Sequence, residues 1–181
     1  MNRELLNVSL RRAATADAEL LHLWRNQAST RRFQASPPRT VAQIASLQAE
    51  QAAVPESPSA VGRIGWIILA DGMPAGHTQL TINPWDRDHA AATLGYMVAD
   101  DYHGLGVATA AVRLVAERAF DGERLRLGRI EAVAAVDNVA SRRVLEKAGF
   151  TFEGIRRGLL VISGQRLDHA CYGLLKTDWD I

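Results

Sequence analysis

Apolar positions in the first 60 residues recur with the spacing of helices. The apolar cluster at 20–24 predicts a helix that ends near Asn26. The segment 41–53 predicts a second helix, and Thr40 is a suitable cap for it. Two polar, proline-containing segments predict loops after these helices, at 31–40 and 54–63.

From Ile64 onward the pattern becomes that of strands. The segments 64–70 and 73–83 predict a hairpin, because Asp71-Gly72 between them is a strong signal for a two-residue turn. Later segments read as strand–helix, strand–helix and then strands. We expect strands at 92–99, 129–136, 150–157, 159–162 and 166–176, helices at 107–120 and 138–149, and a loop at 83–90. The dipeptide Ser163-Gly164 predicts a turn between the last two of these strands. This order predicts an α/β (α+β) layer fold with a mixed sheet, parallel where the two strand–helix units lie.

Composition and charge narrow the class of protein. The 181 residues are 48% apolar and 23% charged, which is typical of one globular domain and excludes a disordered or coiled-coil chain. A net charge of +1 gives no reason to expect DNA or a membrane as partner. Cys171 is the single cysteine, which excludes an internal disulfide and a cysteine-based zinc site, and we expect no metal site. Residues 1–12 lack the apolar stretch of a signal peptide, so we expect a cytoplasmic protein.

The segment His103-Gly104-Leu105-Gly106-Val107-Ala108 joins a predicted strand to a predicted helix. Glycines at this position let backbone N–H groups approach a ligand, and a helix N-terminus favours an anion. The segment lacks the lysine of a P-loop, and Thr109 stands where a dinucleotide motif needs its third glycine. The pattern therefore favours another phosphate-containing ligand, although glycines also serve purely structural turns.

A second motif begins after the strand 129–136. Asn138 is a good helix cap, Ser141 falls in the first turn of the helix, and Gly149 ends it before Phe150. This spacing alone predicts only a well-formed helix.

Together these motifs resemble the GNAT family of acetyl-CoA-dependent N-acetyltransferases. The family's pyrophosphate motif, (Gln/Arg)-x-x-G-x-(Gly/Ala), corresponds to 103–108, and its later signature corresponds to Asn138, Ser141 and Gly149-Phe150. The segment 138–154 and the closing D-x-x-x-Y-x-L-L-x-x-D-W at 168–179 are similar to the ribosomal-protein N-terminal acetyltransferases, the RimJ/RimL-like branch. The resemblance spans the whole chain.

The resemblance implies a single N-acetyltransferase domain over residues 1–181, with a mixed central sheet and helices on both faces. Residues 1–60 would form the helical acceptor side, and residues 61–181 the core that binds acetyl-CoA. The implied reaction is direct attack of a primary amine on the acetyl thioester. The acceptor that we predict first is the α-amine of a protein or peptide N-terminus. A small-molecule amine, such as a polyamine, amino sugar or antibiotic, and a non-catalytic CoA sensor stay open as alternatives.

The resemblance also assigns the residues that would bind the cofactor. Backbone groups of Met97 and Val98 would pair with the pantetheine arm, and a backbone group near Met97 would polarise the thioester carbonyl. Asn138 would bind the pantetheine side, and Arg142 or its neighbour Arg143 would lie near the phosphates. The pyrophosphate would be held by the N–H groups of His103, Gly104, Leu105, Gly106, Val107, Ala108 and Thr109.

The sequence departs from the family at three positions. His103 replaces Gln or Arg, and Thr93 stands where many relatives carry Glu. Leu145 stands where many members place the tyrosine that protonates the leaving thiolate. Ser141 is therefore the best candidate for that acid, and the alternative is that it is an ordinary first-turn serine.

No single general base stands out. His77, Glu131 and Glu153 are candidates, and each also has a structural interpretation, as a packed histidine, a solvent-facing charge and a structural carboxylate. An α-amine, with a pKa of about 7.7–8.0, needs less help than a lysine amine at about 10.4. The lack of a dominant base therefore favours an α-amine or a small-molecule amine.

Other side chains are candidates for the acceptor side. His169 on a late strand is expected to line the acceptor cleft, and relatives form one wall of that cleft from the region of Trp24, Arg31, Arg32 and Phe33. Arginines there would suit a carboxylate or phosphate on the acceptor, unless they are simply solvated. We expect Tyr96, Tyr172 and Trp66 in the core, and a homodimer is open, with 159–162 as an apolar edge.

Overall fold

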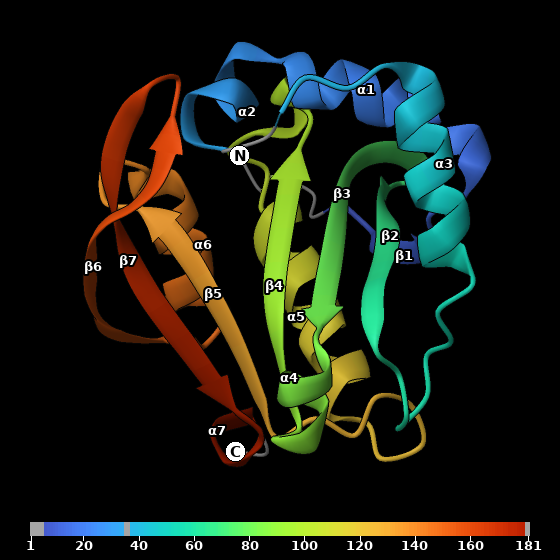
Figure 1. Cartoon of the computed structure of the whole chain (residues 1–181), viewed down its shortest axis with the longest axis vertical. Coiled ribbons are helices and arrows are strands. Elements are labelled where there is room, and N and C mark those ends of the chain that lie inside the picture. Colours follow the sequence, from blue (N-terminus) through green and yellow to red (C-terminus); the bar gives the residue numbers. More distant parts are fainter. Residues whose placement is uncertain (1–5, 35–36, 180–181) are drawn as a thin grey trace.

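A seven-stranded mixed sheet forms the centre of the protein (Figure 1). The computed structural model describes residues 6–34 and 37–179. The strand order is β1-β2-β3-β4-β5-β7-β6; β4 and β5 pair in parallel, and the other neighbours are antiparallel. The strands are β1 (Val8–Arg12), β2 (Gly62–Ala70), β3 (Met73–Ile82), β4 (Ala91–Val98), β5 (Arg129–Ala135), β6 (Thr151–Ile162) and β7 (Gln165–Leu175).

Helices cover both faces of this sheet, as the family resemblance implies. One face carries α1 (Ala18–Asn26), α2 (Ala28–Phe33) and α3 (Val41–Ala52), and the other carries α5 (Val107–Phe120) and α6 (Val139–Lys147). Short helices α4 (Pro84–Asp88) and α7 (Lys176–Trp179) lie at the opposite end from α1 and α2 (Figure 1). The predicted α/β class is confirmed. Within the described residues, none of the helices combines the length and the apolar character that crossing a membrane requires.

The continuous apolar run in β2 follows from burial on both sides. Trp66 packs with Val112 and Val115 of α5, while Ile67 packs with Leu21 and Ile44 of the opposite helical layer. Since successive strand residues point to opposite faces, a strand covered on both faces must be apolar throughout. Each such side chain, when fully buried, stabilises the folded state by about 1.5–3 kcal/mol relative to an exposed one.

Both turns predicted from dipeptides are confirmed. Asp71 and Gly72 have φ values of 50° and 81°, and Ser163 and Gly164 have values of 48° and 80°. Positive φ at both central residues is the requirement of the hairpin turn that matches the twist of the strands. Thr40 also caps α3 as predicted, with its hydroxyl accepting from the Gln43 amide at 3.2 Å.

Several local predictions were wrong. The first 60 residues are not only helical, because β1 pairs with β2 at the edge of the sheet. The predicted loop at 83–90 contains α4, which begins with Asn83 as cap and Pro84 in its first turn. The segments 150–157 and 159–162 form one bulged strand, β6. The predicted loop at 31–40 begins with the end of α2, and its residues 35 and 36 lie outside the described part of the chain.

The parallel pair β4–β5 positions the site. Pairing covers Ala91–Thr93 of β4 with Arg129–Glu131 of β5 and then stops. Figure 1 shows the two strands spreading apart toward the end of β4 that α1 and α2 overlie. Among the described residues, the second half of β4 therefore has no strand partner on its β5 side.

Candidate active site

Two clefts meet where β4 and β5 separate. One, here called the α5/α6 cleft, has a volume of about 560 Å³, and the other, the α1/α3 cleft, has a volume of about 460 Å³. They lie on opposite sides of the second half of β4. The residues that line both are Phe33, Gln34, Tyr96, Met97, Asn138 and Ser141. A group bound in one cleft can thus meet a group bound in the other at these side chains.

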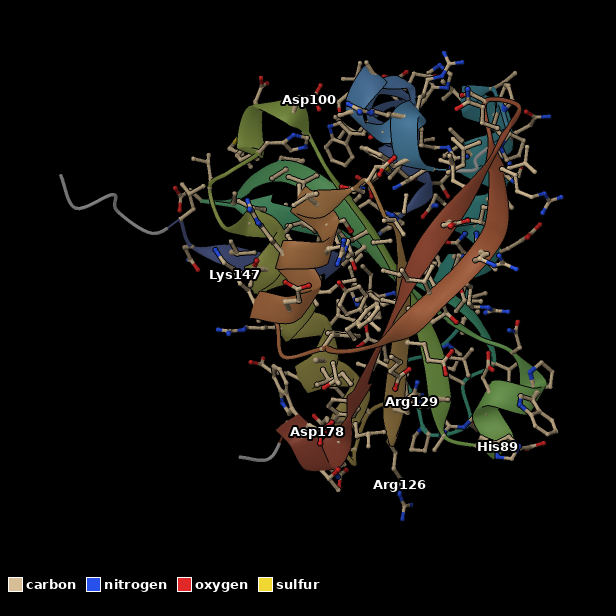
Figure 2. The ribbon with its side chains drawn as sticks, turned by 90° about the vertical axis from the view of Figure 1, so that its left-hand side faces the viewer. His89, Asp100, Arg126, Arg129, Lys147 and Asp178 are labelled. Carbon is tan, nitrogen blue, oxygen red and sulfur yellow. The ribbon has the colours of Figure 1, made fainter. Side chains whose placement is uncertain are left out.

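The α5/α6 cleft is suited to an anion. Gly104 and Gly106 have φ values of 71° and 83°, Gly106 caps α5, and a Cβ at either position would meet no atom within 4 Å. The backbone therefore borders open space at the N-terminus of α5, where N–H groups of the first turn have no partner within the helix. Arg32, Arg143 and Lys147 also line this cleft, and no carboxylate is among its lining residues in the described chain. Figure 2 shows Lys147 on α6.

Most residues predicted to bind the cofactor line this cleft. Two do not. Leu105 packs against the buried cluster around Ile68. Arg142 turns away from the cleft, since its Nε donates to the Tyr172 hydroxyl at 3.2 Å and its Nη1 donates to the Val136 carbonyl at 3.3 Å. Arg143 lines the cleft instead. The predicted cofactor-binding residues that do line the α5/α6 cleft are Met97, Val98, His103, Gly104, Gly106, Val107, Ala108, Thr109 and Asn138.

Side chains bind the carbonyls of β4 near the cleft. Gln34 Nε2 donates to the Tyr96 carbonyl at 3.2 Å, and His103 Nε2 lies 3.0 Å from the Val98 carbonyl, to which it donates. His103 therefore carries its proton on Nε2 when the ring is neutral. Since a carbonyl oxygen can accept two hydrogen bonds, a ligand N–H can pair with the Val98 carbonyl beside His103.

Ser141 sits in a hydrogen-bond network at the junction of the clefts. Asn138 Oδ1 accepts from the Ser141 amide at 3.1 Å, which confirms Asn138 as the cap of α6. The Tyr96 hydroxyl lies 2.7 Å from Ser141 Oγ and 3.1 Å from the Ser141 carbonyl, and it can donate its one proton to either oxygen. Burial raises the pKa of Tyr96 to about 12, despite the hydrogen bond from Ser141. Leu145 is fully buried and lines neither cleft.

The α1/α3 cleft contains buried polar atoms without partners. His77 is 7% exposed, and burial, with the nearby charges of Arg25 and Arg63, lowers its pKa to about 4. Its Nε2 atom has no hydrogen-bond partner within the described residues, nor do the Oε1 atoms of Gln48 and Gln51. Since buried polar groups are nearly always paired, these atoms are available to a ligand or to water.

Three arginines line the same cleft, namely Arg25, Arg39 and Arg63. Burial, together with the charges of Arg39 and Arg63, lowers the pKa of Arg25. In the described part of the chain none of the three forms an ion pair, and no carboxylate lines the cleft. The cleft is therefore positively charged.

The structure does not bring Glu131 or Glu153 to Ser141. Arg129 Nε donates to Glu131 at 2.9 Å and its Nη2 donates to Glu153 at 2.6 Å. The hydrogen bond from Arg129 lowers the pKa of Glu153. Figure 2 shows Arg129 toward the opposite end of the molecule from Asp100, which lies beside α2. Both carboxylates are held in a surface ion-pair group, so neither is available as a base at the junction.

Some of the residues predicted to lie on the acceptor side line a cleft, and others do not. His169 lines the α1/α3 cleft as predicted, and Phe33 lines both clefts. Trp24 is buried in the core, and Arg31 is exposed outside both clefts.

The sequence reading missed the role of one aromatic residue. Trp66 and Tyr172 are core residues, as predicted. Tyr96 was assigned to the core with them, but its hydroxyl meets Ser141. The alternation of β4 places neighbouring Tyr96 and Met97 on opposite faces, and that signal could have assigned Tyr96 to the α6 side.

An anion-binding helix terminus that meets a second polar cleft defines a group-transfer enzyme with two substrates. A family described as "Acetyltransferase (GNAT) domain" matches residues 7–151. The chain therefore belongs to the GNAT acetyltransferases, and its resemblance to them is confirmed. GNAT acetyltransferases use acetyl-CoA.

The chain is also similar in sequence to individual N-acetyltransferases. The chain is 37% identical over 113 residues to "Putative ribosomal N-acetyltransferase YdaF" of Bacillus subtilis, covering 62% of this chain and 60% of that protein. It is 31% identical over 102 residues to "L-amino acid N-acetyltransferase AaaT" of Escherichia coli, covering 56% and 62%. These alignments thus span about three fifths of the length of each relative.

Solved structures cover nearly the whole chain. A "Probable acetyltransferase" has a TM-score of 0.76 at 30% identity, with 98% of this chain and 96% of that chain covered. The spermidine N-acetyltransferase of Vibrio cholerae, solved with CoA and spermine, has a TM-score of 0.82 at 19% identity, with 96% and 98% covered. The second likeness shows a shared fold alone.

The residues of the α5/α6 cleft fit acetyl-CoA. Its pyrophosphate carries negative charge, and the cleft offers free backbone N–H groups at Gly106–Thr109 with three basic side chains. The open space before Gly104 and Gly106 leaves room for phosphate oxygens to approach the backbone.

Proposed function

We propose that the chain transfers the acetyl group of acetyl-CoA to the α-amino group of a protein or peptide N-terminus by direct attack. The observation that carries this proposal is the meeting of the two clefts at Tyr96, Met97 and Ser141. The α5/α6 cleft would hold the cofactor, and the α1/α3 cleft would hold the acceptor. The similarity to a protein named as a ribosomal N-acetyltransferase supports the choice of acceptor.

In this proposal the chain's own groups bind and orient the cofactor, which supplies an activated acetyl thioester. N–H groups at the start of α5 bind the pyrophosphate, and Arg143 and Lys147 add positive charge. Asn138 holds the first turn of α6, so that Ser141 faces the junction. Met97 and Val98 offer backbone groups to the pantetheine arm, which would share the Val98 carbonyl with His103.

Ser141 would supply the proton for the departing thiolate from its Oγ atom and would regain one from the ammonium group that forms when the acceptor amine attacks. When the Tyr96 hydroxyl donates its single proton to Ser141 Oγ at 2.7 Å, rather than to the Ser141 carbonyl at 3.1 Å, the serine proton is free to point into the junction. Leu145 cannot perform this role, because its side chain is apolar and fully buried. Tyr96 acts here as a positioning residue.

The acceptor cleft favours an α-amine over a lysine amine. No carboxylate lines the cleft in the described chain, and His77, with a pKa near 4, is a weak base. An α-amine with a pKa of about 7.7–8.0 is already partly neutral near pH 7.5. Deprotonating a lysine amine there costs about 3–4 kcal/mol more, and no group in the cleft offsets that cost.

A second candidate is the α-amine of a free amino acid. The relative named as an L-amino acid N-acetyltransferase and the arginines of the cleft favour it, since an amino acid carries a carboxylate. A polyamine is disfavoured, because its positive charges would face Arg25, Arg39 and Arg63.

The test is release of free CoA thiol from acetyl-CoA. Peptides with free N-termini, the same peptides with blocked N-termini, L-amino acids and spermidine would be compared at equal concentration. We expect turnover on free peptides and none on blocked ones. Turnover confined to amino acids or spermidine would overturn the peptide assignment. Binding of CoA without turnover on any of these amines would favour the sensor alternative.

Two further expectations from the sequence stay predictions: the cytoplasmic location and the homodimer. For the homodimer, β6 is the end strand of the sheet, and Val161 in the segment 159–162 is exposed. Light scattering after size-exclusion chromatography would measure the oligomeric state.

A further inference from the structure

The three arginines of the α1/α3 cleft lie close enough to repel one another. Arg25, Arg39 and Arg63 come from α1, the segment after residue 37, and β2. Each is half-buried, and the charges of the other two disfavour the protonated form of Arg25. Half-buried like charges without a counter-charge are costly, and an anion bound among them removes that cost.

Polar acceptor atoms lie beside this cationic group. His77 Nε2 and the Oε1 atoms of Gln48 and Gln51 are buried and have no partner in the described chain. Amide oxygens accept hydrogen bonds, and so does the Nε2 atom of a neutral imidazole whose proton is on Nδ1, so this group suits N–H donors of a ligand. The cleft thus offers acceptors for N–H groups and cations for an anion.

The position of Arg63 sets how far the anion lies from the reacting amine. Arg63 Nε lies 3.4 Å from Thr81 Oγ1, and Thr81 pairs with Thr93 of β4. Thr93 precedes Met97, at the junction of the clefts, by four residues, which is roughly 13 Å along a strand. Even with the reach of the side chain, the cation centre lies on the order of 10 Å from the junction.

A free amino acid cannot span this distance, because its carboxylate is two bonds from the carbon that bears its amine. An extended peptide advances about 3.3 Å per residue. An acidic side chain at the third or fourth position would therefore reach the arginines while the α-amine lies at the junction. The peptide N–H groups between them would face His77, Gln48 and Gln51.

We propose that the α1/α3 cleft selects peptide N-termini that carry a carboxylate side chain at the third or fourth position, bound by Arg25, Arg39 and Arg63. This inference rests on the proposed N-terminal acetyltransferase function and names its preferred substrates.

The first test compares matched peptides. One series carries aspartate or glutamate at the third and fourth positions, and the other carries asparagine or glutamine there, with the same first two residues. At saturating acetyl-CoA we expect kcat/KM to be at least about tenfold higher for the acidic series, mainly through KM. The preference should shrink as salt rises from low to about 0.5 M, because screening weakens charge pairs. Equal kcat/KM for both series would overturn the inference.

The second test removes the cations one at a time. Arg63→Gln and Arg25→Gln should each reduce the ratio of acidic to neutral kcat/KM toward one. Arg31→Gln is the matched control, because Arg31 is exposed, lines neither cleft, and should leave the ratio unchanged. A ratio that survives in both cleft variants would contradict the assignment of these residues. Unfolding temperatures of all three variants identify a variant that fails to fold, and the ratio is then read from the other.

A binding measurement separates this inference from the proposed function. Calorimetry with CoA present measures the affinity for acidic and neutral peptides without turnover. Tighter binding of acidic peptides that is lost in Arg63→Gln, with no acetylation, would support the charge selection and refute the peptide acetyltransferase. Acetylation of both peptide series with equal affinity would support the peptide acetyltransferase and refute the charge selection. Acetylation of free glutamate or aspartate in preference to the acidic peptides would overturn the distance argument.

Discussion

At the scale of single residues, the decisive feature is the hydroxyl of Ser141. It lies at the point shared by both clefts, 2.7 Å from the hydroxyl of Tyr96. A serine hydroxyl is a weak acid, so its usefulness depends on the direction of its proton. Tyr96 can fix that direction by donating its own proton to Ser141 Oγ.

We predict that Ser141→Ala lowers kcat by about a hundredfold, the lower end of the range for a lost general acid. The affinity for CoA should change little, because Asn138 still caps α6 through the backbone amide. A thiol-release assay measures kcat, and calorimetry measures the affinity for CoA. Ser46→Ala is the control, since Ser46 is exposed on α3 and bonds only the Ala42 carbonyl. A kcat within twofold of the unmodified chain would reduce Ser141 to an ordinary helix residue.

We predict that Tyr96→Phe lowers kcat by about tenfold, through loss of a hydrogen bond that orients Ser141. If Tyr96 acts through Ser141, the double variant with Ser141→Ala should be no slower than Ser141→Ala alone. Independent, additive losses in this double-mutant cycle would contradict a positioning role. The cycle separates that role from a general loss of packing, which would slow both backgrounds equally.

Residues whose roles depend on neighbours in sequence were predictable, and those that depend on distant neighbours were not. Asn138 was identified as a cap because its partner is three residues away. The group of Arg25, Arg39 and Arg63 was not identified. Only the packing of helices on the sheet brings together α1, the segment between α2 and α3, and β2, which carry these arginines. The sequence directed attention to Arg31 and Arg32 instead, and neither lines the α1/α3 cleft.

At the scale of elements, the start of α5 carries the most specific backbone requirement. Gly106 caps this helix with a φ of 83°, and a Cβ there meets nothing. The requirement is therefore conformational, since the space is open but the left-handed region is costly for other residues.

We predict that Gly106→Ala lowers the free energy of unfolding by about 1–2 kcal/mol and weakens CoA binding, because the turn that directs the N–H groups would relax. Gly122→Ala is the matched control: its Cβ would also meet nothing, and its φ is not in the left-handed region. Chemical denaturation and calorimetry measure both effects. A loss of stability without a loss of CoA affinity would mean that the turn is only structural.

Elements with strong local signals were predicted well. The two dipeptide turns and the helices α3, α5 and α6 follow from capping, turn and periodicity rules. β1 was missed because it has five residues and is defined by pairing with β2, about 50 residues away in the chain. α4 was missed although its cap and first-turn proline are local signals, since it is a single turn inside a polar segment.

At the scale of the whole molecule, the buried neutral His77 links stability to pH. Its folded pKa is about 4, against 6.5 for an unperturbed histidine, because burial and the charges of Arg25 and Arg63 outweigh the attraction of Asp17. Between these two values the unfolded chain binds a proton that the folded chain does not. The stability contributed by a neutral His77 is thus fully present above pH 6.5 and is lost as the pH falls toward 4.

We predict that the free energy of unfolding falls by roughly 3 kcal/mol over this window on account of His77 alone. In His77→Gln the slope between pH 4 and pH 6.5 should become shallower by up to one proton, because glutamine does not titrate. Asp17 also contributes, but its lowered pKa places its loss of stability at still lower pH. His89→Gln is the control, because it makes the same substitution at an exposed position outside the cleft. Urea unfolding at a series of pH values measures each slope, and an unchanged slope in His77→Gln would show that the folded state accommodates a protonated ring in this cleft, against the repulsion expected from its arginines.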